Sequence, residues 1–283
     1  MTQIAVLSDI HGNSVALEAV LTDLENHGRV EAMIILGDLV VFGPDPVGVL
    51  ALLQKQDHIF HIRGNTDRYL IEKQYPGHPD GQDWQSQVLA SFPWTAEQLG
   101  PAELQFLTQL PTQQLLSLSQ DHTVLAVHGS SRSDEDNIRP NTSDTELATM
   151  LNLTPSTSIT ERDYQLLLCA HTHIPVDRML YGRRIVNTGS VGLPFDGKQS
   201  ASYILIHLQP QGNLDIEFRR VAYDVEKTIK QLWDVDHPTA NISTINLRTA
   251  RPLSQDLIYT DNMRKGQRPR IPTNISYHQV EAY

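Results

Sequence analysis

Six short apolar runs in this chain each end in a residue that can bind a metal ion or seat an anion. The polar segments that follow these runs are Ser8–His11, Gly37–Asp38, Arg63–Asp67, His128–Gly129, His171–His173 and Asn187–Ser190. Continuous apolar runs of about four to six residues are typical of strands buried on both faces. Parallel strands bring their carboxyl ends to one edge of a sheet, where α/β proteins place their sites. The pattern therefore predicts a parallel sheet with a polar site at its edge.

The first 65 residues alternate between predicted strands and helices. Strands are predicted over residues 3–7, 32–36 and 59–62, with helices over Asn13–His27 and Pro46–Gln56 between them. This β-α-β-α-β order argues for a parallel sheet. Later strands are predicted over residues 115–118, 123–127, 163–170, 176–181, 184–186, 203–208 and 214–219, and a helix over residues 224–234. Because tight turns separate several of these strands, the second half should contain antiparallel hairpins.

Two segments depart from this rhythm. Residues 66–112 are rich in Gln and Pro, and we expect helices and loops that form an insert or a cap beside the sheet edge. Trp84, Trp94 and Tyr69 should pack in the core of this insert rather than stack on a substrate. After residue 238 the chain turns polar and irregular. Residues 239–283 are therefore interpreted as an extension that packs on the domain, swaps onto a neighbour or is partly disordered.

Composition limits the partners of this 283-residue chain. Its 22 basic and 33 acidic side chains give a net charge of −11, which argues against nonspecific nucleic-acid binding. Cys169 is the only cysteine, so an intrachain disulfide is excluded, and we expect its thiol to be a small buried apolar group. No apolar run approaches the roughly 18 residues that span a bilayer. We therefore expect a cytoplasmic protein without a membrane partner.

The polar ends of the runs supply two carboxylates, one amide oxygen and four imidazoles. These candidate ligands are Asp9, His11, Asp38, Asn65, His128, His171 and His173. Mixed oxygen and nitrogen donors without a thiolate suit Mn, Fe, Zn, Co, Ni or Mg. Side chains two residues apart in an extended chain point to the same side, so Asp9 and His11 should reach one ion as a pair. His171 and His173 either share an ion or divide between two.

The motifs Asp-x-His, Gly-Asp, Gly-Asn-x-Asp, His-Gly and x-His-x-His occur here in that order, each after an apolar run. In this the chain resembles the calcineurin-like metallophosphoesterase superfamily. The stretches Ser8–Asn13, Gly37–Pro46 and Asn187–Gly192 resemble its small bacterial and archaeal phosphodiesterase branch, and the resemblance covers roughly residues 3–208. It implies an α/β (α+β) fold, a four-layer αββα sandwich of two mixed β-sheets flanked by helices, with residues 1–238 as the phosphoesterase domain.

The resemblance also implies a role for each candidate ligand. The implied ligands of a first divalent ion are Asp9, His11 and His173, and those of a second are Asn65, His128 and His171. Asp38 would bridge the two ions, for which we expect manganese first and Fe, Zn, Ni, Co or Mg as alternatives. A hydroxide between two such cations has a lowered pKa and would attack phosphorus in line. The predicted catalytic residues are Asp38, Asn65, Asp67 and His128, of which Asp67 would orient the site.

Thr66 stands where many members of this superfamily carry a histidine that contacts the phosphate or protonates the leaving group. A hydroxyl donates a hydrogen bond but is a poor general acid at neutral pH. We therefore expect hydrolysis of phosphodiester or phosphoanhydride bonds with acidic leaving groups, in a small phosphate ester or a nucleotide. The predicted substrate contacts are Asn65, Arg63, Thr66 and Arg132. Ala170, where glycine is usual, should matter only if its backbone needs a positive φ.

Three other functions stay open. A phosphomonoesterase or protein phosphatase of the same superfamily normally uses the histidine that Thr66 replaces. A nuclease would be expected to carry a basic stripe, which is not evident in this acidic sequence. A non-catalytic metal-binding scaffold would be expected to have lost ligands, whereas all seven are present.

Overall fold

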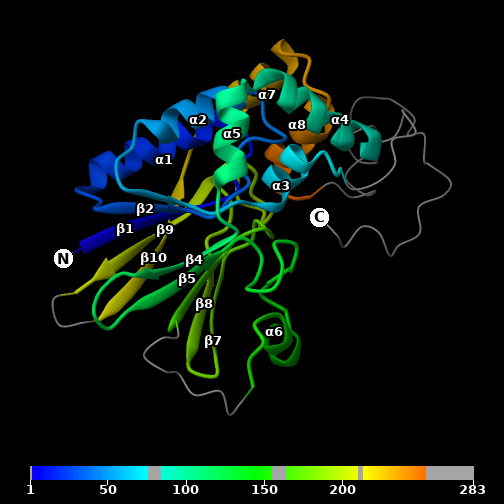
Figure 1. Cartoon of the computed structure of the whole chain (residues 1–283). Coiled ribbons are helices and arrows are strands. Elements are labelled where there is room, and N and C mark those ends of the chain that lie inside the picture. Colours follow the sequence, from blue (N-terminus) through cyan, green and yellow to red (C-terminus); the bar gives the residue numbers. More distant parts are fainter. Residues whose placement is uncertain (1, 76–83, 155–163, 210–212, 253–283) are drawn as a thin grey trace.

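Two five-stranded sheets form the centre of the molecule in the computed structural model, which describes residues 2–75, 84–154, 164–209 and 213–252 (Figure 1). The strands of the first sheet are β1 (Thr2–Leu7), β2 (Ala32–Ile35), β3 (Ile59–His61), β9 (Ala201–Leu208) and β10 (Leu214–Val221), in the order β10-β9-β1-β2-β3. The strands of the second are β4 (Gln113–Ser117), β5 (Thr123–Val127), β6 (Leu166–Cys169), β7 (Val176–Leu180) and β8 (Arg183–Asn187), in the order β4-β5-β6-β8-β7.

Both sheets mix parallel and antiparallel pairs, as the sequence predicted. Strand β2 pairs in parallel with both β1 and β3, and β6 pairs in parallel with both β5 and β8. The hairpins β4–β5, β7–β8 and β9–β10 are antiparallel. Strand β9 also pairs with β1, so the second half of the chain completes the first sheet.

The helices begin and end where local signals place them. They are α1 (Ser14–His27), α2 (Pro46–Gln54), α3 (Asn65–Glu72), α4 (Trp84–Gln98), α5 (Pro101–Gln109), α6 (Asp144–Met150), α7 (Val225–Asp234) and α8 (Ala240–Thr249). Asn13 caps α1 by accepting a hydrogen bond from the backbone N–H of Ala16, and Gly28 ends it with a φ of 116°. Pro46 occupies the first turn of α2, where its missing N–H costs nothing.

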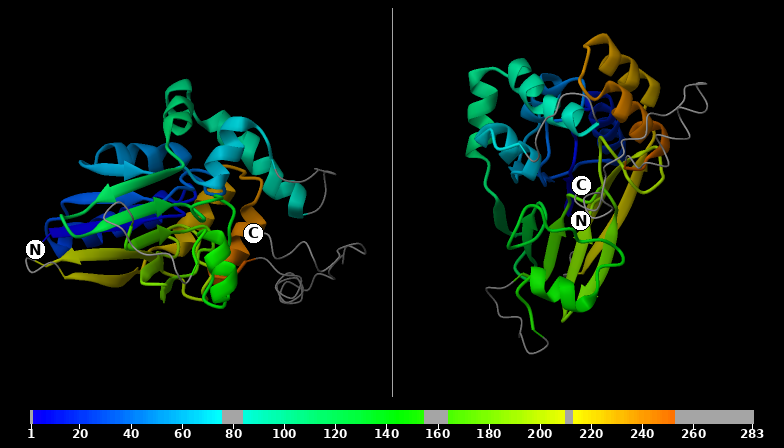
Figure 2. Two further views of the ribbon diagram at one scale, coloured as in Figure 1. Left: turned by 60° about the horizontal axis from the view of Figure 1, so that its bottom comes forward. Right: turned by 90° about the vertical axis from the view of Figure 1, so that its right-hand side faces the viewer.

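Alternate residues of the strands face different cores, and this alternation builds the layers. Ala5 and Leu7 of β1 pack in a core with α1 and α2, whereas Ile4 and Val6 pack between the two sheets. A third core on the outer face of the second sheet joins Leu167 and Cys169 to helix α6. Figure 2 shows the helices outside the first sheet and α6 outside the second. The predicted αββα sandwich is therefore confirmed.

The segment 66–112 is largely helical in its described part, as predicted. Helices α3 and α5 pack against each other, and Tyr69 and Phe92 join the core beneath them with ring centroids 6.1 Å apart. Trp94 of α4 instead meets His237 edge-on at 4.4 Å, so it links the insert to the C-terminal part of the chain. The side chain of Trp84 lies outside the described residues.

The expectation of irregular chain after residue 238 is wrong for residues 240–249, which form helix α8. This helix packs on α7, which is the first of the alternatives left open for the extension. The domain boundary at residue 238 stays a prediction, and residues 253–283 lie outside the described part. Among the helices that the structure describes, none is long and apolar enough to cross a membrane.

Candidate metal centre

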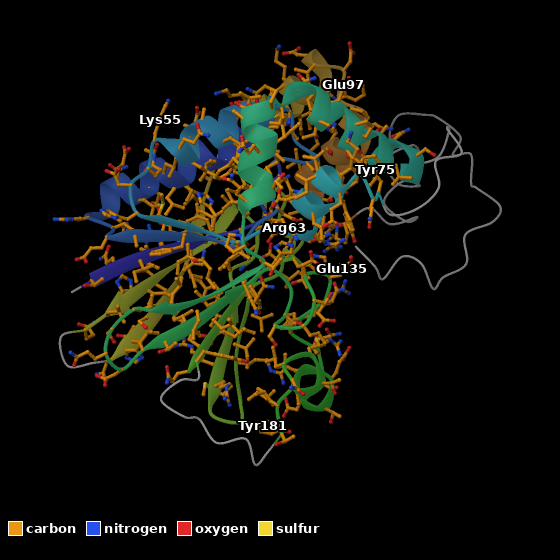
Figure 3. The ribbon with its side chains drawn as sticks, viewed as in Figure 1. Lys55, Arg63, Tyr75, Glu97, Glu135 and Tyr181 are labelled. Carbon is orange, nitrogen blue, oxygen red and sulfur yellow. The ribbon has the colours of Figure 1, made fainter. Side chains whose placement is uncertain are left out.

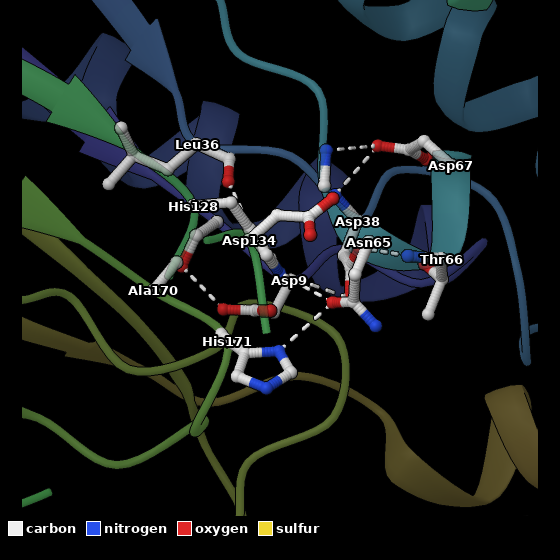
Figure 4. Close-up of polar contacts among 12 residues, drawn as sticks. Asp9, Leu36, Asp38, Asn65, Thr66, Asp67, His128, Asp134, Ala170 and His171 are labelled. Carbon is white, nitrogen blue, oxygen red and sulfur yellow. Dashed lines mark hydrogen bonds and ion pairs between the residues drawn. The ribbon is translucent and has the colours of Figure 1, made fainter. Parts of the chain in front are cut away.

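Five strand ends meet at one edge of the two sheets and bring all seven candidate ligands together. Figure 4 labels Asp9, Asp38, Asn65, His128 and His171 of this set. Asp9 and His11 follow β1, Asp38 follows β2, and Asn65 follows β3 as the first residue of α3. His128 follows β5, and the pair His171 and His173 follows β6. The convergence is a direct consequence of the parallel strands, as the sequence predicted.

The ligand atoms form two groups that share one carboxylate. Asp9, His11, Asp38 and His173 make up the first group, and Asp38, His128 and His171 the second; within each group the ligand atoms lie within 4.8 Å of one another. The Asn65 amide joins the second group, since its Oδ1 lies 2.9 Å from His128 Nε2 and 2.9 Å from His171 Nδ1. His171 and His173 thus divide between the two groups.

Backbone carbonyls orient three of the imidazoles. The Nδ1 atoms of His11, His128 and His173 lie against the carbonyl oxygens of Val41, Leu36 and Leu193 respectively. In a neutral ring, an N–H that donates to such a carbonyl leaves the Nε2 lone pair free and pointing into the centre, which is how proteins prepare histidine for a cation.

Two observations fit this donor set to divalent cations. The Nε2 atoms of His11 and His173 face each other at 3.1 Å, and two lone pairs so placed repel unless positive charge lies between them. The buried Oδ1 of Asp9 has no hydrogen-bond partner within the described chain and lies 3.4 Å from His173 Nε2. A cation would satisfy both the orphaned carboxylate oxygen and the facing nitrogens.

The pKa values of the buried carboxylates and of His128 also favour a bound cation. Burial by itself would raise the pKa of Asp38, but His128, with His11 and His171, outweighs it and holds that pKa well below its usual value. Burial lowers the pKa of His128, yet the Asp38 carboxylate raises it to about 10. Burial, with the Asp38 charge added, raises the pKa of Asp9 to about 8, although His128 opposes the rise. The buried carboxylates therefore require positive charge beside them.

The backbone of the ligands differs from the extended chain that the sequence suggested. Asp9, His11, Asp38, His171 and His173 all have positive φ, between 50° and 69°. The expectation of extended chain at Asp9 and His11 is therefore wrong, although the two side chains do join one group. Left-handed backbone at non-glycine residues is strained, and such strain gathers at functional sites. Ala170 is not among the residues with positive φ, so the alanine there needs no unusual conformation.

Asp67 holds the bridging turn in place. Its carboxylate accepts hydrogen bonds from the backbone N–H groups of Asp38, Leu39 and Gly64, at 2.9, 2.9 and 3.0 Å. Burial and the Asp38 charge raise the pKa of Asp67 to about 6, while these bonds lower it. The N–H of Thr66 donates to Asp38 Oδ1 at 2.9 Å, so the start of α3 fixes the Asp38 side chain as well.

An open pocket lies over the centre. Its floor is formed by His11, Asp38, Asn65, Thr66, His171 and His173. Its walls are formed by Phe42, Val88, Leu193, Phe195, Thr239, Ile242, Ser243, Asn246 and Pro252. The pocket combines apolar walls with a polar floor, the usual composition of a small-molecule site.

Of the four predicted substrate contacts, two line this pocket and two are not among its described lining residues. Thr66 and Asn65 line it, and Thr66 Oγ1 is buried without a hydrogen-bond partner in the described part of the chain. Neither Arg63 nor Arg132 is among the described lining residues. The guanidinium of Arg132 pairs with Asp136 at 2.8 Å, and its side chain is 49% exposed. Substrate roles for the two arginines stay predictions that this geometry does not favour.

Several residues in and around the site were not predicted from the sequence. Arg68 of α3 pairs with Asp134 and Glu135, and so ties the loop after His128 to the helix that carries Asn65 (Figure 3 labels Glu135). Phe42 and Phe195 were not singled out, although Phe42 lies inside one of the motif stretches. The pocket residues of α8 have helical spacing, which is the sequence signal that distinguishes this segment from irregular chain.

Comparison with known proteins identifies the family. The model of the calcineurin-like phosphoesterase superfamily domain matches residues 2–211. The chain belongs to this superfamily. The superfamily is dimetal-dependent, and the buried Asp/His cluster of this phosphoesterase is a site that can bind metals.

Solved and curated proteins are similar to this phosphoesterase over most of its length. A metallophosphoesterase from Sphaerobacter thermophilus is 28% identical, with a TM-score of 0.66 over 88% of this chain and 99% of its own. An uncharacterized protein of Methanocaldococcus jannaschii is 27% identical over 251 residues, which cover 82% of this chain and 92% of that protein. A hypothetical protein from Pyrococcus horikoshii shares the fold, with 24% identity and a TM-score of 0.72 over 89% of this chain and 100% of its own. Family and site together support a phosphoester hydrolase.

Proposed function

We propose that this protein hydrolyses phosphodiester or phosphoanhydride bonds at a centre of two divalent cations. The observation that carries the proposal is the carboxylate of Asp38, which belongs to both ligand groups at the floor of an open pocket. A shared carboxylate between two cation sites is the arrangement that a two-metal phosphoryl displacement uses. The substrate is a small phosphate ester or a nucleotide, and manganese is the ion expected first.

Each ligand group would hold one of the two cations. One cation would be held by Asp9, His11, Asp38 and His173, and the other by Asp38, Asn65, His128 and His171. Two bound cations lower the pKa of water and stabilise charge on the attacking and leaving oxygens. Asp67 keeps Asp38 in position through the backbone, and the free hydroxyl of Thr66 donates a hydrogen bond to a substrate oxygen.

The proton donors that line the pocket limit which phosphate bonds can be hydrolysed. Outside the two ligand groups, the described lining residues include hydroxyl, amide and apolar side chains but no histidine, lysine, carboxylic acid or tyrosine. Such a pocket cannot protonate a basic leaving group near neutral pH. Phosphoanhydrides and diesters of acidic alcohols, whose leaving groups need little protonation, are therefore the favoured substrates.

The test compares bis-p-nitrophenyl phosphate with p-nitrophenyl phosphate, with Mn²⁺ and after chelation. We expect the diester to be hydrolysed faster, and only with the metal. Faster hydrolysis of the monoester would favour the phosphomonoesterase alternative. Bound metal without hydrolysis of either ester would contradict the proposal and favour a metal-binding scaffold. The cytoplasmic location stays a prediction that this assay does not address.

A further inference from the structure

Helix α8 forms one wall of the pocket with a single stripe of residues. Ile242, Ser243 and Asn246 line the pocket together with Thr239 just before the helix, a spacing of three and four residues that puts them on one face. Leu247, the residue after Asn246, packs in a separate apolar core with Leu232 of α7. The stripe is therefore held toward the metal centre by the packing of the helix.

Contacts on several sides make this wall rigid. Arg248 pairs with Glu226 of α7 through two hydrogen bonds of 2.9 and 2.8 Å. The indole N–H of Trp233 donates to Thr244 Oγ1 at 3.2 Å. The N–H of Gly197 donates to the carbonyl of Ala250 at 2.8 Å, which joins the helix end to the loop that carries Phe195. A wall fixed in this way can select a ligand without first becoming ordered.

Among the polar side chains of the stripe, Asn246 is the one with a buried atom that has no hydrogen-bond partner in the described part of the chain. Thr239 and Ser243 satisfy each other at 2.9 Å, and Thr239 also lies 3.0 Å from His237 Nδ1. By contrast, Asn246 is 8% exposed, and its Oδ1 has no hydrogen-bond partner among the residues described. A buried acceptor left unsatisfied destabilises the fold, so its presence at a pocket wall points to a ligand group that satisfies it.

Two aromatic rings line the same pocket as Asn246 and the candidate metal ligands. Phe195 stacks on the metal-site ring of His173, with centroids 4.4 Å apart and planes 13° apart. Phe42 contacts His11, with centroids 5.4 Å apart, and has a φ of 83°, which is a strained backbone for a bulky residue. This backbone strain costs free energy, so the surrounding contacts must hold Phe42 in its conformation. A flat apolar group suits such walls better than a flexible polar one.

We propose that the wall formed by α8 binds a nucleobase and that Asn246 hydrogen-bonds the edge of that base; this inference rests on the proposed function. A nucleobase has apolar faces for Phe42 and Phe195 and N–H groups on its edge. The amide of Asn246 offers both an acceptor and donors, the combination that pairs with the amino group and ring nitrogen of adenine. An alkyl chain would fill the apolar space but leave Asn246 unsatisfied, so the polarity of the pocket favours the base.

The test measures binding rather than turnover. Isothermal titration calorimetry of the Mn²⁺-loaded full chain compares adenosine monophosphate, ribose 5-phosphate and purine riboside monophosphate, which lacks the amino group. We expect adenosine monophosphate to bind at least about tenfold more tightly than ribose 5-phosphate. Asn246→Ala should weaken adenosine monophosphate about tenfold and the purine riboside nucleotide less, because that nucleotide can lose only the bond to its ring nitrogen. Asn241→Ala, on the exposed side of the same helix, is the matched control and should behave as wild type.

A stability measurement guards against a variant that merely unfolds. Because Asn246 is an unsatisfied buried acceptor, Asn246→Leu of similar shape should melt at the same or a higher temperature without ligand, yet bind adenosine monophosphate weakly. Equal affinity of the wild type for adenosine monophosphate and ribose 5-phosphate, or no binding of either, overturns the inference. So does an unchanged ratio of the two affinities in Asn246→Ala. Hydrolysis of bis-p-nitrophenyl phosphate by the same preparation shows whether the proposed function stands when the base site fails.

Discussion

Replacing Asp38 by asparagine removes one negative charge from both ligand groups and changes little else. Asp38 Oδ1 accepts the Thr66 N–H at 2.9 Å, a bond that an asparagine oxygen can keep. The backbone of Asp38 has a φ of 56°, and asparagine is among the residues that tolerate this region best. We therefore expect Asp38→Asn to fold, with a lower melting temperature than the metal-free wild type because its attraction to His128 is lost.

The effect on metal binding should be large. Asp38 Oδ2 lies 3.4 Å from His128 Nε2 and 3.7 Å from His11 Nε2, so this one atom reaches the ligands of both groups. An attraction between unit charges about 4 Å apart is about 4 kcal/mol at an effective dielectric constant near 20, and a divalent ion feels at least this much. Each cation should therefore bind roughly a thousandfold more weakly.

The assay is metal content after equilibrium dialysis against micromolar Mn²⁺, read by mass spectrometry, together with diesterase activity. Wild type should hold about two ions per chain, whereas Asp38→Asn should lose most of both and turn over at background rate. Asp45→Asn is the matched control, because Asp45 only caps α2 by accepting the Gly48 N–H at 2.9 Å, a role that asparagine fills equally well. Retention of two ions with wild-type affinity in Asp38→Asn would refute the bridging role.

Three further predictions test separate parts of the structure. Because Thr66 cannot act as a general acid, the rate of diester hydrolysis should fall steeply as the pKa of the leaving alcohol rises, and a flat series of aryl and alkyl diesters would contradict this. Asp67→Ala leaves three buried backbone N–H groups without their acceptor, so the free energy of unfolding should fall by about 3 kcal/mol, and an unchanged urea midpoint would show that the turn does not need the carboxylate. Burial lowers the pKa of His237 to about 4, so the unfolded chain takes up a proton below about pH 6.5 that the folded chain refuses. Stability should therefore decline by up to about 3 kcal/mol as pH falls from 6.5 to 4, and a His237→Gln variant with the same decline would exclude this residue as the cause.

The strands and the ligand set were accessible from the sequence because they depend on local patterns. The apolar residues of β1 and β6 lie on both faces of buried strands, which is why their runs are continuous. The order of Asp9, Asp38, Asn65 and His128 after such runs then fixes where their side chains gather, since parallel strands end together. The Asn13 cap and Gly28 likewise act within one turn of α1.

Features that depend on distant contacts were not accessible in this way. The left-handed backbone of Asp9 and His11 is set by hydrogen bonds of their N–H groups to the carbonyls of Gly37 and Asp38, almost thirty residues away. Periodicity carries no information about such contacts. His171 and His173 also have positive φ, and they divide between the two groups, a division that the sequence left open.

The sequence by itself determined which residues form the candidate metal centre, because each lies at a strand end that the apolar pattern marks. Only the tertiary structure decided that helix α8 forms a wall of the pocket above this centre. Helix α8 contains Thr, Ile and Asn, whose intrinsic helix propensity is weak, and it is helical because Leu247 packs on α7 and Arg248 pairs with Glu226. That packing turns Asn246 toward the pocket, more than two hundred residues along the chain from the first ligand, Asp9. Long-range packing therefore set the pocket wall, whereas local pattern set the ligands.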